Sequence, residues 1–140
     1  MRCLRRNTGS KYLHGIHRPP WAKSDIIPAF GEHLLKRDGH AMVVEAAKTA
    51  LIMTCLFLQS TWIATLGASR LNAFLKRNRD VQFILFPDND LPGKNWVDIA
   101  NRDGHKVCTS FWEQCQAGED VADVVLRNRQ NRENEGFDGV

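Results

Sequence analysis

The sequence predicts an α/β fold in which a central, mainly parallel sheet of about four strands is flanked by helices. Short apolar segments that are typical of buried strands alternate along the chain with segments of helical spacing. Strands that alternate with helices are joined by right-handed crossovers, which make neighbouring strands parallel. The 140 residues suit a single domain, because a chain of this length builds one core but not two.

The chain divides into a core and two flanking segments. Residues 1–29 contain recurrent Gly and Pro without sustained periodicity, so we expect an irregular, basic lead-in. Residues 30–129 hold the predicted strands and helices, beginning with a helical turn over residues 30–36. Residues 130–140 are polar, and we expect them to form a frayed tail.

The first half of the core predicts two strands with a helix between them. Residues 40–44 form the first strand, which ends at Glu45, and residues 60–65 form the second. The intervening residues 46–58 are apolar nearly all round, so we expect a buried helix. A short helix follows Ser69, its expected N-cap.

The second half predicts two more strands and two more helices. Residues 81–86 are apolar without polar alternation, the pattern of a strand covered on both faces, and residues 105–109 form the last strand. Residues 91–103 have apolar positions at helical spacing, with Gly104 as the expected C-cap. The last helix is expected over residues 119–129.

Three carboxylates follow the predicted strands. Glu45 ends the first strand, while Asp88 and Asp90 follow the third. Because the carboxyl ends of parallel strands meet at one edge of a sheet, we expect these acids to converge there. In an extended loop Asp88 and Asp90 point the same way, so one hydrated Mg²⁺ could contact both. Turn and helix-capping chemistry explains the same residue types, and the residues alone leave both interpretations open.

Composition limits the location and the partners. The net charge of +3 makes the protein mildly basic. The arginines near both ends of the chain are either solvated surface groups or part of a phosphate-binding surface. The four cysteines form no C-x-x-C pair, which is typical of free thiols in a reducing compartment. The chain starts without an apolar leader, and its longest apolar stretch, residues 49–58, is too short to cross a bilayer. We therefore expect a soluble, cytoplasmic protein without a membrane partner.

Five short motifs follow one another between residues 41 and 127. They are VVEAAKTA (43–50), WIATLG (62–67), FILFPDNDLPG (83–93), GHKV (104–107) and GEDVADVVL (118–126). In this order they resemble the Toprim domain, a Rossmann-like domain of bacterial primases, topoisomerases and several nucleases. FGEHLL at residues 30–35 and the E-x-x-K-T-A pattern look like a Toprim-like branch of uncharacterised proteins from bacterial mobile elements. Those relatives often carry a zinc-binding segment upstream, so we expect this chain to be a shortened version or a fragment.

The resemblance implies a role for each acid. Glu45 would be the general acid/base of phosphoryl transfer, while Asp88 and Asp90 would hold Mg²⁺, with Mn²⁺ as a substitute. Lys48, about one helical turn beyond Glu45, would contact a phosphate or pair with Glu45.

The last motif allows two interpretations. Asp120 and Asp123 would hold a second metal ion, or they would cap and solubilise the last helix. The family commonly has Gly directly after the Glu, where this chain has Ala46. It also commonly has Lys before the first Asp of this motif, where the chain has Glu119. If the first position requires a positive φ, Ala carries a conformational cost.

Three functions follow from the resemblance. The first is a Mg²⁺-dependent phosphoryl-transfer domain acting on nucleic acid, associated with DNA primase and a mobile element. It implies DNA rather than RNA as the substrate, and a helicase or another replication protein as a partner. The second is a Mg²⁺-dependent nuclease, and the third is a catalytically degenerate module that binds nucleic acid or a replication partner.

Overall fold

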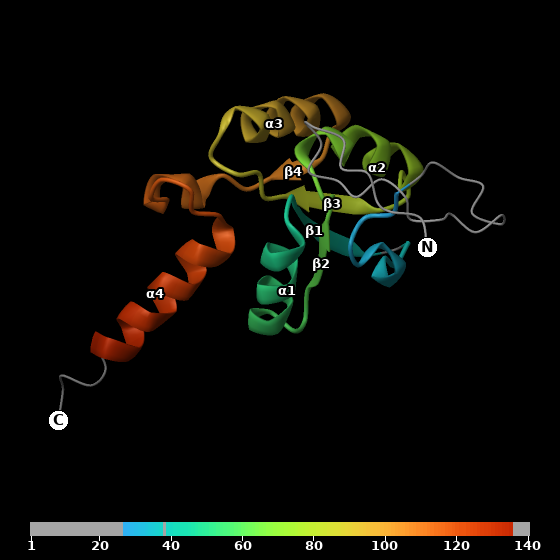
Figure 1. Ribbon diagram of the computed structural model, residues 1–140. Coiled ribbons are helices and arrows are strands. Elements are labelled where there is room, and N and C mark those ends of the chain that lie inside the picture. The colour runs from blue at the N-terminus through green and yellow to red at the C-terminus, as the bar shows by residue number, and fades with distance from the viewer. Residues whose placement is uncertain (1–26, 38, 136–140) are drawn as a thin grey trace, which may run out of the picture.

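The computed structural model describes residues 27–37 and 39–135, and it confirms the α/β architecture (Figure 1). Its sheet consists of β1 (His40–Val44), β2 (Thr61–Ala64), β3 (Gln82–Leu85) and β4 (Lys106–Val107). The strand order is β2-β1-β3-β4, and all the pairs are parallel. β1 and β3 are therefore the two central strands.

Helices cover both faces of the sheet (Figure 1). On one face, α2 (Leu71–Arg77) and α3 (Leu91–Asp103) pack against alternate strand side chains such as Val43 and Leu85. On the other face, α1 (Ala47–Leu56) and α4 (Val121–Glu135) share a second cluster with Val44. Successive residues of β1 thus enter different clusters, as the period of two in a strand requires.

The short connections differ from the predictions in detail. Three 3-10 helices join the elements: η1 (Glu32–Leu34), η2 (Ala68–Arg70) and η3 (Ser110–Gln114). The N-cap assignment of Ser69 was wrong, because Ser69 lies inside η2, and α2 begins after Arg70 without a side-chain cap. Gly104 does cap α3, with a left-handed φ of 75°.

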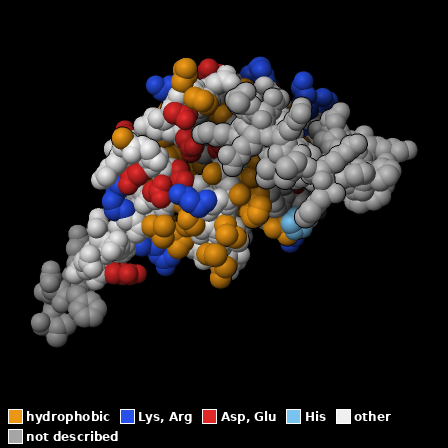
Figure 2. Space-filling model, in the orientation of Figure 1, with side chains coloured by type: hydrophobic (Ala, Val, Ile, Leu, Met, Phe, Trp, Pro, Cys, Tyr) orange, Lys and Arg blue, Asp and Glu red, His pale blue; other side chains and the backbone are white. Residues whose placement is uncertain are grey.

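The expectation that α1 is buried on all sides was also wrong. Its buried residues are Thr49, Ala50 and Met53, whereas Leu51 is 57% exposed. α1 crosses beside the edge strand β2, so only one side of the helix meets the sheet. Figure 2 shows the hydrophobic side chains that gather over this helix.

The ends of the core also differ from the expected boundaries. Phe30 forms an antiparallel bridge with Ala64 of β2, through backbone hydrogen bonds of 2.8 and 3.0 Å. At the other end, residues 130–135 continue α4 rather than fraying. The lead-in up to residue 26 and residues 136–140 lie outside the described residues.

Within the described part of the chain, none of the helices combines the length and apolar character needed to cross a bilayer. The cysteines there, Cys55, Cys108 and Cys115, are free thiols.

Candidate functional site

Parallel pairing of the two central strands brings the predicted acids to one edge. Val43 of β1 lies opposite Leu85 of β3, and the Phe86 N–H donates to the Val43 carbonyl at 2.8 Å. Glu45 and the loop that begins at residue 87 therefore leave the sheet side by side. The structure thus places Glu45, Asp88 and Asp90 at the same carboxyl edge of the sheet.

Close packing fixes the loop that carries Asp88. The Asp90 N–H donates to the Asp88 carbonyl at 2.9 Å, and the Asp90 Oδ1 accepts from the Gly93 N–H at 2.7 Å. Asp90 is thereby the N-cap of α3. A Cβ at Gly93 would lie 1.8 Å from the Asp88 carbonyl oxygen, so only glycine allows this approach. Trp112 adds a hydrogen bond of 2.8 Å to the Pro87 carbonyl.

The Asp88 carboxyl is the electrostatic centre of the site. Burial raises its pKa, and the negative charges of Glu45, Asp120, Asp90 and Asp123 raise it further, to about 6. A carboxyl with this pKa is partly protonated near neutral pH. The neighbouring carboxylates at this edge thus add to the effect that burial has on Asp88.

Asp120 and Asp123 at the start of α4 form a reciprocal cap. The Asp120 Oδ1 accepts from the N–H groups of Ala122 at 2.8 Å and Asp123 at 3.1 Å. The Asp123 Oδ2 accepts in turn from the Asp120 N–H at 3.2 Å. The buried Thr49 hydroxyl of α1 donates to the Asp120 Oδ2 at 2.6 Å. The capping interpretation therefore accounts for both aspartates.

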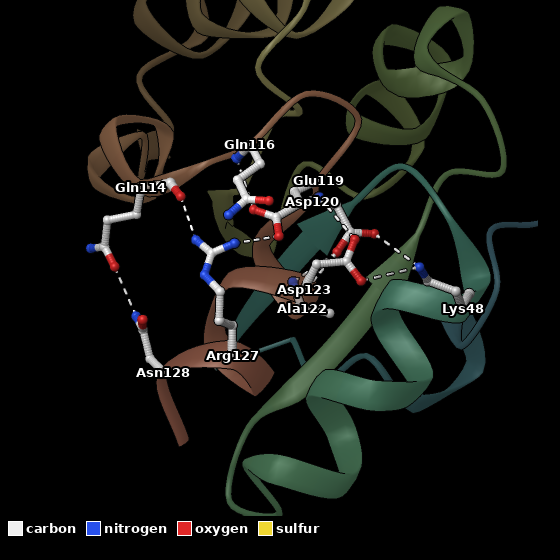
Figure 3. Close-up of polar contacts among 9 residues, drawn as sticks. All are labelled: Lys48, Gln114, Gln116, Glu119, Asp120, Ala122, Asp123, Arg127 and Asn128. Carbon is white, nitrogen blue, oxygen red and sulfur yellow. Dashed lines mark hydrogen bonds and ion pairs between the residues drawn. The ribbon is translucent and has the colours of Figure 1, made fainter. Parts of the chain in front are cut away.

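Lys48 joins α1 to the cap of α4. Its Nζ lies 3.7 Å from the Asp120 Oδ2 and 3.6 Å from the Asp123 Oδ1 (Figure 3). Lys48 thus pairs with the two α4 aspartates and not with Glu45, the partner that the sequence suggested. The Lys48 side chain remains 62% exposed, so its ammonium can still reach a ligand.

A pocket of about 360 Å³ opens between the Asp88 loop and the segment before α4. Its lining includes Asp88, Asp90, Cys115, Glu119 and Asp120. Burial, followed by the charge of Glu119, raises the pKa of the Cys115 thiol. Gln116 and Ala117, which form part of this wall, were missed by sequence reasoning because they belong to no periodic or catalytic pattern.

Arg127 holds this wall in place. It pairs with Glu119 and donates to the Gln114 carbonyl, while the Gln116 N–H donates to Glu119 at 2.8 Å (Figure 3). The hydrogen bond from Gln116 and the pair with Arg127 hold the pKa of Glu119 below its usual range. Glu119 stands where the Toprim family commonly has Lys. Through its pair with Arg127 it helps to hold α4 in place.

The second departure, Ala46, causes no strain. Ala46 is extended, with φ −96° and ψ 140°, and it precedes α1 as the N-cap residue. This backbone conformation is open to any L-residue, so the replacement of Gly by Ala carries no penalty in φ here.

The donors suit a weakly held, hydrated cation better than a closed metal cage. Among residues 27–37 and 39–135, no group of three or more His, Cys, Asp or Glu side chains is arranged to hold a metal ion. Asp88 and Asp90 offer hard carboxylate oxygens, and Mg²⁺ commonly binds one or two carboxylates while it keeps several waters. The donor set thus fits Mg²⁺ only with water or phosphate as the remaining ligands.

Comparison with known proteins places the chain in one family. The profile of a domain of unknown function (DUF6371) matches residues 6–89, which is more than half of the chain, and the chain belongs to this family. The matched segment includes Glu45 and Asp88 and ends before Asp90. No curated protein and no solved structure gives a significant match.

Replacement of Asp88 by Asn should stabilise the fold above pH 6. The pKa of Asp88 is higher in the folded chain than in the unfolded chain, so the wild type loses stability as the pH rises from about 4 to about 6. Asn lacks the charge, and after allowance for solvent screening we expect a gain of about 1–2 kcal/mol at pH 8. The gain should vanish near pH 3. Urea unfolding at both pH values measures it.

Asp98→Asn, at an exposed position of α3, is the matched control and should leave the unfolding midpoint unchanged at both pH values. An Asp88→Asn variant that is less stable than the wild type at pH 8 would contradict the electrostatic account.

Gly93→Ala should destabilise the protein although Ala favours helices. The new Cβ would overlap the Asp88 carbonyl, and we expect a loss of about 1–3 kcal/mol in urea unfolding. Gly39→Ala is the control, because its Cβ would meet Lys36 at an ordinary 3.5 Å. Equal stability of Gly93→Ala and the wild type would show that the approach of Gly93 to Asp88 is not required.

Proposed function

We propose that this DUF6371 protein is a Toprim-like, Mg²⁺-dependent phosphoryl-transfer domain that acts on nucleic acid. The observation that carries the proposal is the convergence of acids at the carboxyl edge, where burial and then four neighbouring carboxylates raise the pKa of Asp88. Mutual repulsion of this kind is relieved by a divalent cation, and binding of the cation would release the proton from Asp88. Parallel α/β sheets commonly bind their ligands at this edge.

Two aspartates would hold the cation. Asp88 stands at the centre of the negative potential, and Asp90 uses only its Oδ1 for the cap of α3. The second oxygen of Asp90 makes no hydrogen bond within the described residues and is available as a ligand. When bound, Mg²⁺ would neutralise charge on a phosphate.

Glu45 and Lys48 would act on the substrate. Glu45 is partly buried at the end of β1, beside Asp88, and its carboxylate would take or give a proton at the reacting oxygen. Lys48 is exposed one helical turn away, and its ammonium would contact a phosphate oxygen. Binding of a phosphate there would compete with the ion pairs that Lys48 makes with α4.

The order of the acids along the chain supports a primase-type role. We infer a domain associated with DNA primase and a mobile element, with DNA preferred over RNA. A primase also needs template and nucleotide binding, so a helicase or another replication protein would be the partner. A nuclease would use the same acids to activate water.

A non-enzymatic binding module is the second candidate, and a specific observation favours it. Asp90 caps α3, while Lys48 and Asp120 are held in contacts between α1 and α4. These three charged groups thus stabilise the fold, and this role does not depend on catalysis.

Calorimetric titration with Mg²⁺ and Mn²⁺ tests the proposal. Wild type should bind with release of protons near pH 6, and Asp88→Asn/Asp90→Asn should weaken binding by roughly tenfold or more. Asn is as good an N-cap as Asp, so the double variant should keep the start of α3. Glu45→Gln should retain binding of the cation while it loses any cleavage or primer synthesis.

Asp98→Asn provides the control for the loss of one exposed carboxylate and should bind the cations as wild type does. Absence of cation binding by folded wild type, with and without an oligonucleotide, would reject the metal-dependent function and favour the binding module. Degradation of DNA by the isolated chain would identify the nuclease.

A further inference from the structure

A second concave surface lies at the opposite edge of the sheet, where α2 and α3 end and β4 begins. It contains a cavity of about 630 Å³ and an adjoining cavity of about 360 Å³, which share Arg79, Asp103 and His105. Lys76 and Arg102 line the first cavity, while His40 and Lys106 line the second. We call these two cavities the basic groove. Figure 2 shows Lys and Arg side chains gathered over the ends of α2 and α3.

Positive charge dominates the basic groove. Asp103 is the one carboxylate among the described residues that line it, and Arg102 already binds this group through hydrogen bonds of 2.7 and 2.9 Å. Lys76, Arg79 and Lys106 are exposed and have no ion-pair partner within the described ranges. As far as the described residues are concerned, these three cations are therefore available to an anion from solution.

Helix dipoles explain only part of this charge. Cations near a helix C-terminus are favourable because the carbonyl groups there carry partial negative charge. Lys76 and Arg102 lie in the last turns of α2 and α3. Arg79, His105 and Lys106 lie beyond those helices, in connecting segments and in β4, where the dipole gives no reason for them.

The basic groove is also lined by a flat ring, the imidazole of His105. His105 lines both cavities, is only partly exposed, and packs with its ring centroid 5.7 Å from that of the buried Phe83. Grooves that bind single-stranded nucleic acid combine cations that follow the phosphates with flat side chains on which bases stack. The two adjoining cavities provide both features in one continuous surface.

We propose that the basic groove binds the phosphate backbone of single-stranded nucleic acid. The residues that carry the interaction are Lys76, Arg79 and Lys106, with His105 as a stacking surface. β1 runs from His40 at the groove to the carboxyl edge, so the groove and Glu45 are separated by about 16 Å of extended chain. The groove is thus a holding site that is distinct from the acidic site. It requires no metal and does not rest on the proposed phosphoryl transfer.

Fluorescence anisotropy with a labelled oligothymidylate in EDTA tests this proposal. Wild type should bind, and the affinity should fall as salt increases. Lys76→Gln/Arg79→Gln should weaken binding by roughly tenfold at low salt and reduce the slope of log affinity against log salt by about 1.4. Arg129→Gln/Arg132→Gln removes the same charge from exposed positions on α4 and should change binding by less than about twofold.

Three results would overturn the proposal. The first is the absence of binding by wild type, and the second is an equal loss in the groove and α4 variants, which would indicate unspecific attraction by net charge. The third is equal binding of a duplex or of polyglutamate at matched charge, because neither requires stacking. Circular dichroism checks that both variants are folded. The assay contains EDTA, so failure of the proposed metal site leaves this result intact.

Discussion

The parallel pairing of β1 with β3 is the constraint on which the rest of the site depends. It places Glu45 beside the Asp88 loop, although the two are far apart in the sequence. The close approach of Gly93 then holds Asp88 in its partly buried position. The energy of this arrangement comes from the apolar clusters on both faces of the sheet, which compensate for the repulsion among the acids. The acidic edge is thus electrostatically unfavourable and is supported by a well-packed core.

Much of this architecture could be predicted from the sequence, because it depends on local patterns. Residues 40–44 and 91–103 have strong strand and helix signals, and both elements have the predicted bounds. The exposed side of α1 could not be predicted, since a helix that is apolar all round gives no sign of which side meets the sheet. The ion-pair partners of Lys48 could not be predicted for a similar reason. The rule for neighbours on one helix pointed to Glu45, whereas α4, distant in sequence, supplies its partners.

The charged groups of the chain fall into two classes that the sequence does not separate. Asp120, Asp123 and Lys48 connect α1 with α4, and their charges are largely matched by one another and by backbone N–H groups. Among the described residues Asp88 has no such partner, and burial together with the neighbouring negative charges raises the pKa of its carboxyl. At the other edge of the sheet the imbalance has the opposite sign. The two ends of the parallel strands therefore carry opposite charge. The carboxyl ends are acidic and the amino ends are basic.

Titration of the Asp88 side-chain carboxyl carbon by NMR, without and with Mg²⁺, would show directly whether the acidic edge raises the pKa of Asp88 and binds a cation. Without metal we expect a pKa of about 6, because burial and four neighbouring carboxylates disfavour ionisation. We also expect Mg²⁺ to lower this pKa, since a bound cation stabilises the carboxylate. An Asp88 pKa within the ordinary carboxyl range, unchanged by Mg²⁺, would contradict both the electrostatic description of the edge and the function proposed from it.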